Sequence, residues 1–218
     1  MSDTGIVLAA SLSIPEELLL LSMDDEKGRL VSSDSIILRF VLAGAILDDL
    51  VLRKEIEIQD GKVVAWTGEP VGDPILDPAI ERLTRKNKVK KLSYWIQQLA
   101  KDYRDMRTIL LKKMVALGAL REELHYFLWV FPYDRYPTDN TRIEDRIRDR
   151  IRDSLFGRDP ISARDAVILS LIYASRLEAE VFGQESAREA RERIATLRKQ
   201  YGIGSAVTNA ILSFDMSL

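Results

Sequence analysis

Arg104 and Arg107 lie three residues apart in a segment whose apolar residues repeat with helical spacing. On a helix this separation places both guanidinium groups on one face. Arginine can bind a phosphate through two parallel hydrogen bonds, so the pair predicts a site for a phosphoester head group. The alternative is that Asp102 and Asp105 neutralise both arginines in ordinary surface ion pairs.

Cations are concentrated around this pair. Residues 82–113 contain eleven lysines and arginines but two acids, a charge of +9 in a chain whose net charge is −2. Such a basic surface can contact an anionic lipid surface, a nucleic acid or an acidic protein face. We expect Arg82, Arg85 and Lys86 to assist the arginine pair, and no nucleic acid to bind, because the remaining surface is strongly acidic. The alternative is a solvated helix whose charge is balanced elsewhere in the fold.

An aromatic segment, residues 124–133, follows the basic region and ends in a proline and a tyrosine. Its composition predicts a β-hairpin. Aromatic side chains favour membrane interfaces when exposed, so the hairpin could insert into a membrane or join copies of the chain; buried, the same side chains are core. The residues proposed for this contact are Tyr126, Phe127, Trp129 and Phe131.

The residues needed for several kinds of catalysis are missing from the sequence. Without cysteine there are no disulfides, thiol nucleophiles or thiolate metal sites, and His125 is the one histidine. Glycine-rich phosphate loops and nucleophile-elbow motifs are also absent. Paired acids such as Asp48–Asp49 point apart on a helix. We therefore expect no enzyme activity, no cofactor and no metal site.

The longest apolar run, Ile36 to Leu47, is twelve residues long and contains Arg39. It is too short and too charged to cross a bilayer. Asp3 stands where a secretory signal would carry basic residues. We therefore expect a cytoplasmic protein.

Mainly α-helical structure is predicted from end to end. Ser13, Pro15 and Glu16 mark a helix start, and Asp60-Gly61 marks a hairpin turn between two alternating strands. Gly118 is expected to follow the end of the arginine-bearing helix. Further helices are expected over 35–49, 92–99, 141–156, 160–182, 184–201 and 206–214. The result is a mainly α single domain over residues 12–214, after a tail of residues 1–11.

Several motifs in co-linear order resemble the Golgi phosphoprotein 3 family. They are PEELLLL at Pro15–Leu21, DDEKGR at Asp24–Arg29, LAGAIL at Leu42–Leu47, GDPILD at Gly72–Asp77, WIQQL at Trp95–Leu99, YRDMR at Tyr103–Arg107, LGAL at Leu117–Leu120 and LIYAS at Leu171–Ser175. Together they cover roughly residues 12–212, and the compact chain is most similar to bacterial members.

This resemblance implies a fold around a four-helix core. It also implies a peripheral membrane protein, on the cytosolic face of the membrane, without catalytic activity. It implies binding of phosphatidylinositol 4-phosphate or a similar anionic lipid, and of the cytosolic tails of membrane enzymes, which such proteins retain at the Golgi in eukaryotes. The family's lipid pocket combines an R-x-x-R pair, matched by Arg104 and Arg107, with a loop tryptophan and arginine. Here the loop 29–35 has no tryptophan, and Ser33 stands about where the arginine is expected.

The function expected is therefore a membrane adaptor that holds an anionic head group against Arg104 and Arg107, with Trp129 and its neighbours entering the interface. The alternative is a soluble adaptor that binds protein tails through the hairpin and the basic surface without lipid. The hairpin could also join copies of the chain into a homo-oligomer.

Overall fold

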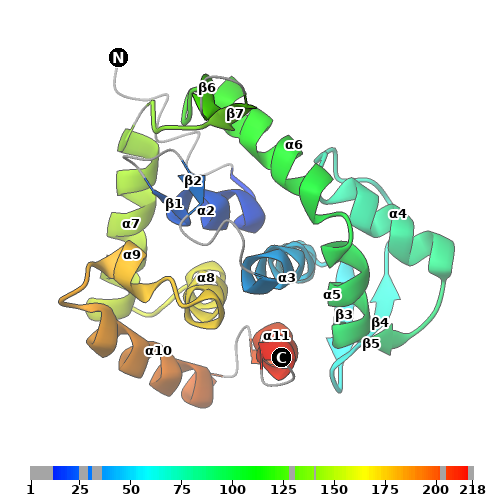
Figure 1. Cartoon of the computed structure of the whole chain (residues 1–218). Helices are drawn as coiled ribbons and strands as arrows, with labels where there is room; N and C mark the ends of the chain where they lie inside the picture. The colour runs from blue at the N-terminus through cyan, green and yellow to red at the C-terminus, as the bar shows by residue number, and fades with distance from the viewer. Residues whose placement is uncertain are drawn as a thin grey trace.

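The computed structural model describes residues 12–24, 29–30, 36–127, 131–139, 141–201 and 205–215. Within these ranges the chain is mainly α-helical, with three small antiparallel sheets around the helices (Figure 1). The predicted fold class is confirmed. The N-terminal tail predicted at residues 1–11 lies outside the described residues.

Helix α2 (Ile14–Leu21) is buried on every side, including its two acids. The predicted start of the helix is confirmed, because Glu16 Oε2 accepts the backbone N–H of Ser13 at 2.8 Å. The strands β1 (Met23–Asp24) and β2 (Arg29–Leu30) follow it as an antiparallel pair. A helix with no solvent face must find partners for every charge it carries.

Helix α3 (Ile36–Leu52) is the centre of the fold. Helices α2, α5 (Leu92–Ala100), α8 (Ala163–Ser175) and α11 (Ser205–Asp215) pack against it. Its nearly continuous apolar sequence predicted this burial. Gly44 lets α11 approach closely, because a Cβ there would lie 2.7 Å from Ile211 Cδ1 and 2.8 Å from Val207 Cγ1.

A three-stranded sheet covers one end of the molecule. Strands β3 (Ile56–Gln59) and β4 (Lys62–Trp66) form the predicted hairpin, whose turn residues Asp60 and Gly61 both have positive φ. The two-residue strand β5 (Lys90–Lys91), which we had not predicted, pairs with the free side of β4. Helix α4 (Asp77–Lys86) lies between β4 and β5 in the chain.

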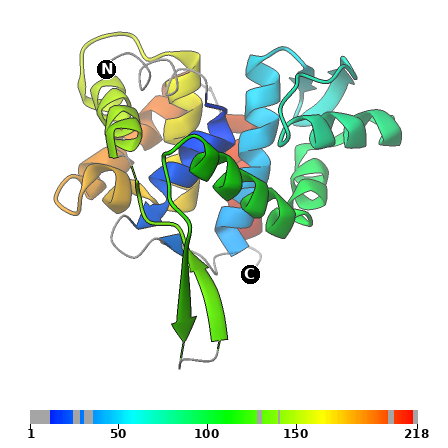
Figure 2. The same ribbon diagram turned by 90° about the horizontal axis from the view of Figure 1, so that it is seen from above.

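Helix α6 (Tyr103–Ala116) runs from α5 to a second hairpin made of β6 (Glu123–Phe127) and β7 (Phe131–Arg135). Gly118, at φ 69°, follows the end of α6 as predicted. The hairpin strands project away from the helices (Figure 2). The predicted hairpin is therefore confirmed in its backbone.

The remaining helices are α7 (Thr141–Phe156), α9 (Glu178–Phe182) and α10 (Ala187–Tyr201), which surround α8 on the side away from α6 (Figure 1). The single helix predicted over 160–182 is wrong, because α8 ends at Ser175 and α9 begins at Glu178. Arg176 adopts a left-handed conformation at φ 60°, and the Ser175 hydroxyl donates back to Leu171 O, so the chain turns there. Among the described residues, no helix is long and apolar enough to cross a membrane.

Candidate anion-binding site

Arg104 and Arg107 lie in the first turns of α6, directly after the junction with α5. The helical backbone places both side chains on one face, as the sequence predicted. Unpaired N–H groups and the helix dipole make this end of the helix favourable for an anion. The two arginines therefore occupy the positive end of the helix.

Neither arginine forms an ion pair within the described residues. Arg104 is exposed, whereas Arg107 is half-buried and its Nε is buried without an acceptor. A buried donor without a partner costs about 1–3 kcal/mol, a cost that an anion at this position would remove. Arg107 is thus the more constrained of the two.

The acids beside the pair do not neutralise it. Asp102 Oδ2 lies 2.5 Å from Nη2 of Arg82, whose Nη1 also donates to Gln98 O at 2.6 Å. Asp105 is exposed and has no ion-pair partner in the part of the chain that the structure describes. The alternative in which Asp102 and Asp105 neutralise Arg104 and Arg107 is therefore wrong within the described residues. The guanidinium of Arg82 instead ties α4 to the end of α5.

The base of the second hairpin lies near Arg107. The Tyr136 hydroxyl donates to Glu122 Oε1 at 3.0 Å, which joins the two ends of the hairpin. Burial and the hydrogen bond to Glu122 raise the pKa of Tyr136 to about 12, and the charge of Arg107 acts in the opposite direction. The charge of Arg107 thus acts on the base of the hairpin.

The other residues predicted for the site are dispersed. Arg85 and Lys86 are exposed in the last turn of α4, the end of that helix that points away from α6 (Figure 1). Ser33 and Trp129 lie outside the described residues. Tyr126 and Phe127 in β6 and Phe131 in β7 are described in their backbone positions, with Phe127 opposite Phe131.

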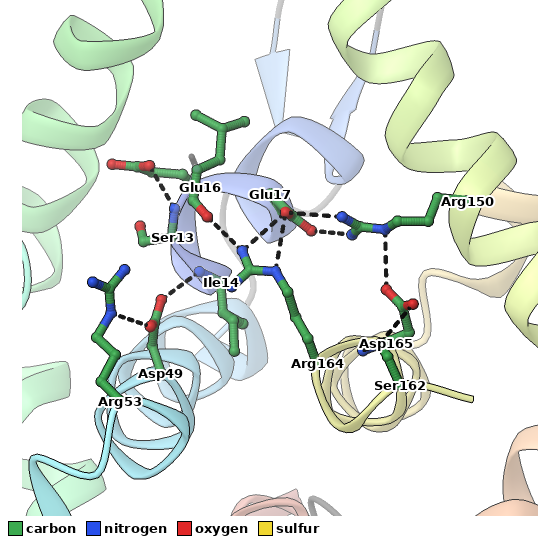
Figure 3. A network of polar contacts seen from close by, with 11 residues as sticks. Ser13, Ile14, Glu16, Glu17, Asp49, Arg53, Arg150, Ser162, Arg164 and Asp165 are labelled. Carbon is green, nitrogen blue, oxygen red and sulfur yellow. Dashed lines mark hydrogen bonds and ion pairs between the residues drawn. The ribbon is translucent and has the colours of Figure 1, made fainter. Parts of the chain in front are cut away.

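Sequence analysis missed the polar network that anchors α2 in the fold (Figure 3). The same network also holds α6. Lys113 on α6 forms an ion pair with Glu16 and lies 3.0 Å from Asp73 Oδ2. Burial alone would lower the pKa of Lys113, but its hydrogen bonds to these two acids outweigh that effect and raise it. The helix that presents the arginines is thereby held at its other end by buried charge.

The second acid of α2 is held just as firmly. Glu17 forms ion pairs with Arg150 of α7 and, at 2.9 Å, with Arg164 of α8 (Figure 3). Arg150 also lies 3.0 Å from Asp165, which the hydroxyls of Ser154 and Ser162 contact at 2.9 and 2.8 Å. On the α3 side, Asp49 accepts the Ile14 N–H and the Arg53 Nε–H, both at 2.6 Å. The adjacent acids of α2 were the available sequence signal, but their partners lie more than 90 residues away.

The geometry around Arg104 and Arg107 can bind an anion through two fixed positive charges. No group of three or more histidine, cysteine or acidic side chains that could hold a metal ion occurs in the described ranges.

A comparison with protein-family models gives one finding: the model described as Golgi phosphoprotein 3 (GPP34) matches residues 14–213. This match spans nearly the whole chain and contains both arginines, the hairpin and the buried network.

Proposed function

The chain belongs to the Golgi phosphoprotein 3 family, and from this premise we propose that it is a non-catalytic peripheral membrane protein that binds the phosphate of an anionic lipid head group. The observation that carries the proposal is the pair Arg104 and Arg107, which has no acidic partner among the described residues at the N-terminal end of α6. The nearby hairpin supplies a second membrane contact.

The unsatisfied Nε of Arg107 favours a phosphate ligand over a diffuse negative surface. A phosphate oxygen can accept from Nε and from a second guanidinium nitrogen in the same plane. Arg104, one turn away and exposed, then adds charge without needing to be ordered beforehand. A phosphomonoester such as that of phosphatidylinositol 4-phosphate offers more oxygens and more charge than a diester lipid, so we expect it to bind more tightly.

Other cations have different parts in this proposal. Arg85 and Lys86 are exposed and have no ion pairs within the described chain, so they attract an anionic surface over a longer range. Arg82 is already bound to Asp102 and Gln98 and acts in the proposal as a structural residue. Ser33 and the aromatic residues of the hairpin remain proposed contacts by family resemblance.

Vesicle flotation tests the proposal directly. Vesicles of neutral phosphatidylcholine are compared with vesicles that also contain phosphatidylserine or phosphatidylinositol 4-phosphate, at low and at physiological salt. At about 1 kcal/mol for each cation near an anionic surface, Arg104→Ala/Arg107→Ala should weaken binding about thirtyfold. Arg188→Ala, at an exposed site on α10, is the matched control and should bind like the wild type. If the wild type does not float with either anionic vesicle at low salt, the proposal fails.

A second candidate function, binding of protein tails, is favoured by a groove between α4, α5 and α6. The groove has a volume of about 220 Å³ and an apolar floor that includes Ile75, Met106 and Ile109, with Asp102 and Asp105 at its rim. Ile109 is one of the large apolar side chains exposed on the described surface. Such a groove suits a segment in which a large apolar residue precedes a cationic one.

Titration of labelled peptides in the absence of lipid separates this candidate from the first. A peptide with a leucine followed by an arginine should bind, and Asp105→Lys or Ile109→Glu should abolish the binding. The variant Arg104→Ala/Arg107→Ala, which should bind lipid more weakly, should still bind the peptide. Equal binding of a peptide with both residues changed to serine would show that the groove is not the site.

A further inference from the structure

A second, apolar cavity is lined by residues of α8 and α10. These two helices lie on the side of α3 away from α6 (Figure 1). The volume of the cavity is about 90 Å³. The walls are formed by the loop before α8 and by apolar side chains that include Ile161, Ala166, Leu169, Ile194 and Leu197. Because the lining is almost wholly aliphatic, water gains few hydrogen bonds there, and an apolar group is the favoured occupant.

One charged residue, Arg198 of α10, belongs to this lining. Its Nη2 donates to Asn209 Oδ1 of α11 at 2.8 Å, and its guanidinium carbon lies 4.7 Å from the centre of the Tyr173 ring. These contacts fix the plane of the guanidinium group. They leave its Nε buried and without an acceptor.

Arg198 differs from Arg191 and Arg193 of the same helix in having no acidic partner among the described residues. Arg191 lies 2.6 Å from Glu178, and Arg193 lies 3.0 Å from Glu189. Arg198 forms no ion pair with any described residue. Burial and the nearby charge of Arg191 lower the pKa of Arg198, which agrees with a cation that lacks a counter-charge.

We propose that this cavity binds a small monocarboxylate, with its aliphatic tail between α8 and α10 and its carboxylate on Arg198. An alkyl tail matches the aliphatic walls, and one anionic group matches a guanidinium that has no acidic partner among the described residues, so a monocarboxylate supplies both. A volume of about 90 Å³ leaves room for a short alkyl tail, so butanoate and hexanoate are the ligand sizes to test. This site is independent of the arginine pair on α6.

Calorimetric titration of the intact chain with three six-carbon probes tests the proposal. Hexanoate should bind at least about tenfold more tightly than 1-hexanol, and hexylammonium should bind least, because the three share a tail and differ in charge. Acetate, which has no tail to fill the cavity, should bind more weakly than butanoate. If the wild type binds none of the probes, or binds hexanoate and hexanol equally, the proposal is overturned.

Variants assign the binding to this cavity. Arg198→Met keeps the aliphatic stem but removes the charge, and it should abolish the preference for hexanoate over hexanol. Ala166→Leu fills the cavity and should weaken both ligands while Arg198 stays in place. Arg188→Met, at an exposed position on the same helix, should change neither. Thermal unfolding of each variant confirms that it is folded, and unchanged hexanoate binding by folded Arg198→Met would refute the assignment.

Discussion

The buried network around α2 and the exposed start of α6 use arginine in opposite ways. Around α2, Arg150 and Arg164 converge on Glu17, whose side chain has no exposed surface. At the start of α6, Arg104 and Arg107 have no acidic partner among the described residues, although two acids lie beside them in sequence. Both regions are connected by α6 itself, which carries Lys113 into the network at its other end.

The difference follows from the cost of burying charge. A buried carboxylate without a cation is very costly, so Glu16 and Glu17 fix the positions of their partners. An exposed guanidinium is hydrated by water and can stay unpaired at little cost. Arginines of the first kind hold the fold together, and those of the second kind are available to a ligand. The next four predictions test this distinction, beginning with the largest effect.

Removing the charge of Glu17 should have the largest effect on stability. Glu17→Gln leaves Arg150 and Arg164 facing a neutral amide, and breaking a buried ion pair on one side typically costs about 3–5 kcal/mol. The free energy of unfolding, measured by urea titration, should fall by that amount. Glu192→Gln, at an exposed position on α10, is the control and should stay within about 0.5 kcal/mol of the wild type. Equal effects at the two positions would remove the distinction between the regions.

Sequence reasoning predicted the local features of the comparison but not its long-range ones. The capping of α2 by Glu16, the Asp60-Gly61 turn and the shared face of Arg104 and Arg107 depend on neighbours within a few residues, and the structure contains all three. The α8–α9 break was missed because Arg176 adopts its left-handed conformation without the glycine that usually marks one.

The electrostatic partners could not be predicted, because they depend on how distant helices pack. Glu17 is 133 residues from Arg150 and 147 from Arg164. Asp102 forms its ion pair with Arg82 of α4 and not with Arg104, which is two residues away in the sequence. The strand β5 was missed for the same reason. Two lysines carry no strand pattern of their own, and they form a strand only by pairing with the edge of β4.

Asp48 sharpens the comparison because it is a buried acid that has no cationic partner among the described residues. Burial, and then the charge of Asp49, raise the pKa of Asp48 well above its ordinary value, so the folded chain keeps this carboxyl protonated where the unfolded chain ionises it. The stability that it contributes is complete below the ordinary pKa and is lost as the pH rises toward the folded-state pKa.

Asp48→Asn should therefore raise the free energy of unfolding at pH 7 by an amount on the order of 1–3 kcal/mol. Near pH 3 the substitution should change the free energy of unfolding little. Urea titrations across this pH range give the free energy of unfolding of the wild type and of the variant. Because both proteins carry the same other acids, the contributions of those acids cancel in the difference between the two values. A constant difference at all pH values would mean that Asp48 is ionised in the folded chain. In that case burial would not require an acid to be either paired or protonated.

Arg82 is intermediate between the two regions, and its substitution should have an intermediate effect. Its guanidinium is bound to Asp102 and Gln98, but Asp102 is about half exposed, so the pair is weakened by solvent. Arg82→Ala should lower the free energy of unfolding by about 1 kcal/mol and reduce vesicle binding less than Arg104→Ala does. If Arg82→Ala reduces vesicle binding more than Arg104→Ala, Arg82 is a ligand contact and belongs with the α6 pair.

The smallest effect on stability is expected at the α6 pair itself. Arg104→Ala should leave the free energy of unfolding within about 0.5 kcal/mol of the wild type, because the side chain is exposed and unpaired within the described chain. Arg107→Met keeps the buried stem and removes the unsatisfied Nε, so its stability should be equal or slightly higher. Each variant should weaken vesicle binding about fivefold, because each removes one cation worth about 1 kcal/mol near an anionic surface. A residue that costs nothing to remove from the fold, yet is needed for binding, carries function and not structure. A loss of stability at Arg107 comparable to that of Glu17→Gln would place it in the buried network instead.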